Sequence, residues 1–142
     1  MKLDKHIIAL REVIDEINSA LEDEEGLIRH QRRLALMISL GMAELIEIYF
    51  HKLHIMKEGS RIKHDWLKKK DIKEILSNQI TSSIDSVEEI NELLKICKKV
   101  EDRRNDIAYS SPLDEEDLLK EEINDFFKLK ELIEKIVGVV EL

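Results

Sequence analysis

The stretch that most constrains the fold is LALMISLGMAELIEIYF, residues 34–50, in which apolar side chains fall on nearly every side of a helix. A helix that is apolar all round is buried at the centre of a protein or covered by a partner chain. The stretch therefore predicts a long central helix over residues 27–57. Gly41 within it costs roughly 1 kcal/mol relative to Ala, so we expect it to mark the close approach of another helix.

Two helical segments and a shorter element are predicted beside this one. Residues 3–22 carry a narrow apolar seam with spacings that alternate between four and three, which is typical of helix-on-helix packing. The seam consists of Leu3, Ile7, Leu10, Ile14, Ile17 and Leu21. Gly26 is expected to stop that helix. The shorter element covers residues 64–80. The capping-box spacing of Ser86 and Glu89 predicts a further helix from Asp85 or Ser86 to about Tyr109.

A last helix is predicted after Pro112, which interrupts the pattern, with Ser111 or Asp114 as its cap. Its apolar side is formed by Leu119, Ile123, Phe126, Ile133, Ile136 and Val140. The chain has 142 residues with four glycines and one proline, which suits a single helical domain over residues 1–142 with a sizeable core. The predicted fold class is all-α, an antiparallel bundle of about five helices.

The sequence also indicates the cellular compartment of the protein. We find no apolar run that approaches the roughly 20 residues needed to cross a bilayer. The start of the chain, MKLDKHIIALREVIDE, carries charges throughout and does not resemble a signal peptide. The lone Cys97 excludes an internal disulfide and is expected to be a small buried hydrophobe. These features predict a soluble cytoplasmic protein with no membrane partner.

Charge is unevenly distributed along the chain. The net charge of −8 argues against nucleic-acid binding over the whole surface. Residues 52–73, however, contain eight Lys or Arg against three acids, whereas the segment after Pro112 is acidic. Two solvated faces of opposite sign explain this asymmetry, and a basic surface for phosphate groups is the alternative. Under that alternative the candidate RNA-binding residues are Arg61, Lys63, His64, Lys68 and Lys69.

The helix expected to end near Tyr109 changes its chemistry before it ends. Its core face is made by Ile90, Leu94 and Cys97, and the same face continues through Glu101, Arg104, Asn105 and Ala108. Asp102, Arg103 and Asp106 are expected to point toward water. Either the helix leaves the core here with a solvated end, or these polar groups form a pocket at a domain or subunit boundary. Glu101 can reach Arg104 at i+3 and Asn105 at i+4.

The central helix carries a candidate metal site. Glu47, His51 and His54 lie at i, i+4 and i+7, a spacing that can bind a divalent metal. A polar stripe on the surface explains the same spacing, and the Glu-x-x-His pairs of a di-iron bundle do not occur. Gly-rich phosphate loops, nucleophile elbows and zinc spacings are also missing from the sequence. We therefore expect no metal and no cofactor.

The segment RRNDIAYSSPLDEEDLLKEEINDFFKLKELIEKI, residues 103–136, resembles the C-terminal part of HEPN domains. These are small all-α proteins that often accompany minimal nucleotidyltransferases. Their signature is an Arg, usually followed by Asn, with a His four to six residues beyond, and Arg104 and Asn105 match its first two positions. The basic IKHDWLKKK, residues 62–70, resembles the segment that precedes this helix in many members. The resemblance implies a homodimer in which the Arg104 regions face each other, with RNA and a minimal nucleotidyltransferase as partners.

The chain departs from the family at one position, because Tyr109 stands where catalytic members carry His. In those members the His shuttles protons and the Arg supports the scissile phosphate of RNA, without metal. A phenol is a poor general base at neutral pH because it ionises only at about pH 10, but it can bind phosphate or stack on a base.

The resemblance therefore implies an RNA-directed protein of a toxin–antitoxin or defence pair, a degenerate endoribonuclease. Its candidate catalytic residues are Arg104, Asn105, Tyr109 and Glu101. The alternative is a non-catalytic helical module that holds a minimal nucleotidyltransferase or its substrate. In that case Arg104 is only an anchor.

Overall fold

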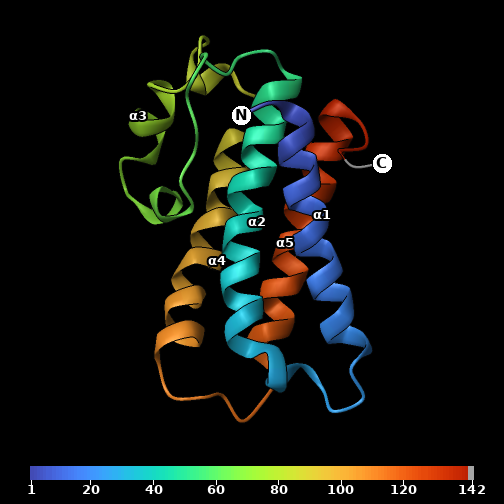
Figure 1. Cartoon of the computed structure of the whole chain (residues 1–142). Helices are drawn as coiled ribbons and strands as arrows, with labels where there is room; N and C mark the ends of the chain where they lie inside the picture. The colour runs from blue at the N-terminus through green and yellow to red at the C-terminus, as the bar shows by residue number, and fades with distance from the viewer. Residues whose placement is uncertain (141–142) are drawn as a thin grey trace.

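Four long helices form an up-and-down bundle in the computed structural model, which describes residues 1–140 (Figure 1). They are α1 (Leu3–Glu22), α2 (Gln31–Lys52), α4 (Ile90–Tyr109) and α5 (Asp117–Val137). The short elements are η1 (Leu27–His30), η2 (His64–Lys68), α3 (Ile72–Ser77) and η3 (Ile84–Ser86). Each long helix runs opposite to the one before it, and the predicted all-α antiparallel bundle of about five helices is confirmed.

The apolar helix α2 lies at the centre of the bundle. It packs against α1, α4 and α5, so its own chain covers most of its surface. Within residues 1–140, Leu27–Lys52 is the one helical stretch long and apolar enough to cross a membrane. Of its most apolar window, 72% is buried inside the bundle, as expected of a core helix. The predicted central helix is confirmed, and its apolar character needs no second chain to explain it.

Gly41 marks the closest approach of α2 to its neighbours. A Cβ atom added there would lie 2.7 Å from Cε2 of Phe126 on α5 and 2.8 Å from Cγ1 of Val13 on α1. Both distances are well below van der Waals contact, so only glycine lets the three helices pack this tightly. The predicted close approach at Gly41 is confirmed.

Several helix boundaries differ from the predicted ones. The central α-helix ends at Lys52 rather than near residue 57, and the element predicted over 64–80 divides into η2 and α3. The expected capping box is also wrong, because α4 begins only at Ile90. The Ser86 hydroxyl donates to the Ser83 carbonyl at 2.6 Å, and Glu89 adopts a left-handed conformation with φ of 60°. Ser86 thus closes a local turn instead of capping a helix.

The last helix begins later than predicted, at Asp117, and neither Ser111 nor Asp114 caps it. Glu116 precedes it and makes a tertiary contact instead. Its carboxylate accepts a hydrogen bond from the Leu27 backbone N–H at 2.6 Å. This bond joins the loop before α5 to the turn between α1 and α2, so the Glu116 side chain serves a tertiary contact and does not cap the helix.

The segment between α2 and α4 folds back along the side of the bundle, where Figure 1 shows α3 and its flanking loops. Within it η2 packs against α4 and α2. Ile62 and Leu67 are buried and fix the segment in place. Residues 61–65 are thereby held against the middle of α2, beside the polar groups described next.

Candidate functional site

The structure brings Arg104, Asn105 and Tyr109 together at the C-terminal end of α4. Arg104 donates from Nη1 to Oδ1 of Asn105 and from Nη2 to the hydroxyl of Tyr109, each at 3.3 Å. Its guanidinium carbon lies 5.5 Å from the centroid of the Tyr109 ring, and that tyrosine is 71% exposed. The Nε atom of Arg104 is buried and has no hydrogen-bond partner among residues 1–140.

Glu101 is turned away from this group. Its carboxylate is almost completely buried and accepts a hydrogen bond from the hydroxyl of Ser39 on α2. His64 completes the arrangement, with its Nδ1 3.0 Å from Oγ of Ser39 and 3.6 Å from Oε1 of Glu101. The contacts expected from Glu101 to Arg104 and Asn105 are therefore replaced by contacts to α2 and η2.

The contacts of Ser39 with Glu101 and His64 determine the tautomer of the His64 ring. Because the Ser39 hydroxyl donates to Glu101, its oxygen accepts from Nδ1–H of His64, which leaves Nε2 as the basic nitrogen of the neutral ring. The His64 side chain is partly exposed, so solvent or a ligand can reach it. A histidine oriented by a hydroxyl and a buried carboxylate is suited to accept or donate a proton. Glu101 and His64 were predicted as site residues but Ser39 was not, because its only signal is a single serine inside the apolar stretch 34–50.

Arg103 does not point toward water as predicted. It lies against α5 with its side chain 18% exposed, and donates from Nε to Glu122 at 2.7 Å and from Nη1 to Glu121 at 3.2 Å. Its Nη2 also bonds Asp125. The expectation was wrong because the acidic face of α5 packs against this side of α4 and supplies partners that the helix itself does not contain.

One guanidinium thus faces three carboxyl groups. Burial alone would lower the pKa of Arg103, but its bonds to Asp125 and Glu122 raise it. Glu122 is fully buried, and this burial raises its pKa to about 8 even though Arg103 opposes the shift. Arg103 is therefore neutralised by α5, whereas its neighbour Arg104 contacts only neutral groups within the described residues.

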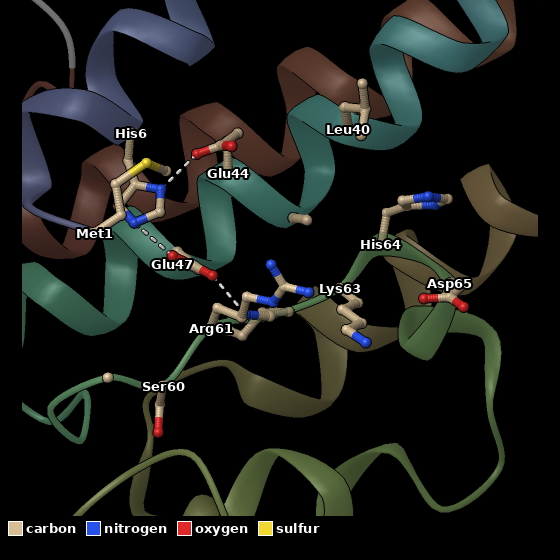
Figure 2. Close-up of a pocket in the computed structure, with 13 residues that line it drawn as sticks. Met1, His6, Leu40, Glu44, Glu47, Ser60, Arg61, Lys63, His64 and Asp65 are labelled. Carbon is tan, nitrogen blue, oxygen red and sulfur yellow. Dashed lines mark hydrogen bonds and ion pairs between the residues drawn. The ribbon is translucent and has the colours of Figure 1, made fainter.

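The predicted RNA-binding residues do not all line the same cavity. Arg61, Lys63 and His64 line a cavity of about 560 Å³ that also reaches His6 and Glu47 (Figure 2). Lys69 lies on a different groove, of about 360 Å³. Its cationic lining consists of Lys69, Lys70, Lys73, Lys95 and Lys98, above an apolar floor of Leu67, Ile72 and Leu94. Lys68 lines neither, and the lysines that α4 contributes to the groove were not predicted.

A cluster of His and Glu side chains lies between α1 and α2. His6 is 2% exposed, with Nδ1 2.6 Å from Oε2 of Glu44 and Nε2 2.5 Å from Oε2 of Glu47. Glu47 is 4% exposed, so the expected polar surface stripe is wrong at this residue. His51 is half-buried, with its ring centroid 5.2 Å from that of His6. His54 lies exposed beyond the end of α2 and is not part of the cluster.

The electrostatics of the cluster follow from its burial. Burial alone lowers the pKa of His6, but its close contacts with the carboxylates of Glu44 and Glu47 outweigh this and raise the pKa to about 9. Burial lowers the pKa of His51, and the charge of His6 lowers it further. His6 therefore holds a proton between two carboxylates while His51 stays neutral. The sequence offered no signal that joins His6 to Glu47, because the two are distant along the chain.

Comparison with known proteins found no matching family model, no similar curated protein and no similar solved structure.

Proposed function

We propose that this chain is a HEPN-like, RNA-directed protein of a toxin–antitoxin or defence pair, in which Arg104 binds a backbone phosphate. The observation that carries the proposal is the uncompensated charge of Arg104. Its guanidinium bonds an amide and a phenol, and its buried Nε has no partner within residues 1–140. A phosphate supplies the negative charge that this half-buried side chain lacks, since guanidinium binds phosphate with paired, charge-assisted hydrogen bonds.

Tyr109 adds a surface for a nucleobase beside that phosphate. Its ring is exposed and lies next to the Arg104 guanidinium. Unpaired RNA bases stack on aromatic rings and on guanidinium planes, with about 1–3 kcal/mol per base from the ring. Arg104 and Tyr109 are thus arranged to bind one nucleotide of single-stranded RNA, with the phosphate on the arginine and the base on the tyrosine.

In the catalytic form of this proposal, His64 takes the role of the base. Metal-independent cleavage of RNA needs a group that removes the proton of the 2′-hydroxyl and a cation that supports the phosphate. Tyr109 is unsuited to the first task, whereas His64 presents its Nε2 and is oriented by Ser39 and Glu101. Glu101, whose carboxylate helps to orient His64, lies on α4 one helical turn before Arg104.

RNA binding and cleavage can be measured separately. Fluorescence anisotropy with a labelled single-stranded RNA gives the affinity, and gel analysis in the presence of EDTA gives cleavage. Arg104→Gln should weaken binding about tenfold or more, because one charged hydrogen-bonding partner is worth roughly 1.5–3 kcal/mol. Arg103→Gln is the matched control, since α5 already neutralises Arg103. Equal loss in both variants, or no binding by the natural chain, would refute the proposal.

A second candidate function is a non-catalytic helical module for a minimal nucleotidyltransferase or its substrate. The observation that favours it is Tyr109, which stands in the position of the expected base. Under this function the natural chain binds RNA or its partner without cutting RNA, and His64→Gln changes nothing. Under the catalytic form His64→Gln removes cleavage and leaves the affinity within about twofold. Tyr109→His is the complementary variant, because it restores the family's base and should produce or raise cleavage.

The proposed homodimer places the Arg104 regions of two chains opposite each other. Leu36 and Leu40 support it, because these large apolar side chains are exposed one turn apart on α2. Arg32 on the same helix donates to the carbonyl of Ser110, which joins this face to the end of α4. A Leu36→Gln, Leu40→Gln double variant should be monomeric in analytical ultracentrifugation if this face is the interface. A natural chain that is already monomeric would remove the dimer from the proposal.

A further inference from the structure

The His and Glu cluster between α1 and α2 lies apart from the Arg104 region. His6 is near the start of α1, at the end of the bundle opposite to the C-terminal end of α4 (Figure 1). Among residues 1–140, His6, Glu47 and His51 offer ligand atoms that all lie within 4.8 Å of one another. They come from two helices whose packing is fixed by the core, so the fold itself brings them together.

We propose that His6, Glu47 and His51 bind a divalent metal ion of the zinc type, with Glu44 orienting His6. Two nitrogen ligands and one carboxylate form a ligand set that suits Zn²⁺. His6 and Glu47 are both more than nine-tenths buried, and Nε2 of the first and Oε2 of the second meet each other as an ion pair but make no aligned hydrogen bond among the described residues. Buried polar atoms without a well-aligned hydrogen bond are rare and call for an explanation.

These two atoms face each other at 2.5 Å without the alignment of a hydrogen bond. A cation placed between them would satisfy both. Two ligands on a tetrahedral zinc lie about 3.3 Å apart, because each bond is about 2.0–2.1 Å long. The Glu47 carboxylate must therefore move by less than about 1 Å, which is a side-chain adjustment and leaves the helices in place.

Further hydrogen bonds already orient His6 and Glu47, two of the proposed metal ligands. Nδ1 of His6 lies 2.6 Å from Oε2 of Glu44, so the ring donates to a carboxylate and turns Nε2 toward Glu47 (Figure 2). A carboxylate behind a histidine is the usual support of a histidine that binds metal, because it fixes the tautomer and raises ligand basicity. The other oxygen of Glu47 accepts the Ile62 backbone N–H, which anchors the carboxylate.

The site also has room for a further ligand. His6, Glu44 and Glu47 line the cavity of about 560 Å³ that Arg61 and Ser60 border on the opposite side (Figure 2). Three protein ligands leave the fourth position of a tetrahedral ion open. Water or an anionic group can enter from the cavity and occupy it.

The alternative to a metal is a proton that His6 shares with the two glutamates. Direct titration separates the two. Protein dialysed against EDTA and then freed of the chelator is titrated with ZnCl₂ in a calorimeter. The proposal predicts one equivalent of Zn²⁺ for the natural chain and binding at least about tenfold weaker for His51→Asn. Glu44→Gln should weaken binding by roughly 10–100-fold, the usual effect of removing such a support.

His54→Asn is the matched control. His54 is exposed and left-handed with φ of 59°, a conformation that Asn adopts readily. This variant should bind Zn²⁺ like the natural chain, and Zn²⁺ should raise the melting temperature of both but not that of His51→Asn. His51 is only half-buried, so its replacement should disturb the core little. No stoichiometric binding by the natural chain, or equal loss in the His51 and His54 variants, would overturn the metal site.

Discussion

Replacing the adjacent arginines one at a time tests the division of roles between them. The pair of variants is Arg103→Met and Arg104→Met, in which an unbranched apolar side chain replaces the guanidinium and keeps most of its stem. Arg103 is bonded to three carboxyl groups of α5, and Glu122 among them is fully buried. Removing one partner of a buried ion pair costs about 3–5 kcal/mol, because the other charge stays buried and uncompensated.

Two features of the site reduce this energetic cost for Arg103→Met. Glu121 is mostly exposed, so its contact to Arg103 adds less than about 1 kcal/mol. Burial raises the pKa of Glu122 to about 8, so that carboxyl already holds a proton at neutral pH and leaves little uncompensated charge once Arg103 is gone. The expected loss of stability for Arg103→Met at neutral pH is therefore about 2–4 kcal/mol. The loss should be larger above about pH 8, where Glu122 is charged and loses its cation.

Arg104→Met should behave differently. The variant loses two hydrogen bonds of 3.3 Å to neutral groups and a contact with the Tyr109 ring, each worth at most about 1 kcal/mol at an exposed site. It also removes the buried Nε that has no partner in the described residues, which is a gain. We expect its stability to stay within about 1 kcal/mol of the natural chain.

Urea denaturation followed by circular dichroism gives both values, and a constant slope against urea shows that the same transition is compared. RNA affinity is measured on the same samples. The expected pattern is an unstable Arg103→Met that still binds RNA and a stable Arg104→Met that does not. If Arg104→Met were the less stable of the two, Arg104 would be a structural residue and the reasoning would fail.

Three further outcomes are expected. The native pKa of Glu122, about 8, exceeds its ordinary value of 4.5, so the native state holds a proton that the unfolded chain releases. This group therefore makes the free energy of unfolding fall as pH rises from 4.5 to 8, and Glu122→Gln should flatten that slope in urea titrations across the range. Gly41→Ala gains about 1 kcal/mol of helix propensity but places a Cβ 2.7 Å from Phe126, so a net loss of about 1–2 kcal/mol is expected in thermal melts, and a gain would show that the helices separate easily. Ser39→Ala leaves the buried Glu101 without its donor and should lower the free energy of unfolding by about 1–3 kcal/mol, whereas an unchanged value would mean that water replaces the hydroxyl.

The long-range architecture could be predicted because it depends on a property that the sequence displays directly. A helix that is apolar on every side, residues 34–50, has to be surrounded, and the seam over residues 3–22 provides a helix to cover it. The close helix approach at Gly41 could also be predicted, because glycine is costly inside such a helix. Helix starts could be predicted less well, because a short polar side chain can bond to several different backbone groups. Ser86 bonds the Ser83 carbonyl, so the capping box does not form.

The same limit applies to the candidate site: contacts within one helix could be predicted, but contacts between different elements could not. Arg104, Asn105 and Tyr109 lie within two turns of one helix, so helical spacing alone brings them close. The partners of Glu101 could not be inferred that way, because Ser39 and His64 come from other elements. A helical wheel identifies the face on which a side chain lies but not the group that meets it.

The two arginines show why a count of charges is a poor guide to what this surface binds. They are adjacent, and the helix rotation of about 100° between them sends one to α5 and the other to the exposed side of Tyr109. The acidic run after Pro112 suggested a solvated face, yet part of it is bound to Arg103 and leaves that arginine with no charge to offer. A net charge of −8 is therefore compatible with an RNA-binding site, because binding depends on the cations that remain unpaired. Within residues 1–140, Arg104 is a cation of that kind, beside an exposed aromatic ring.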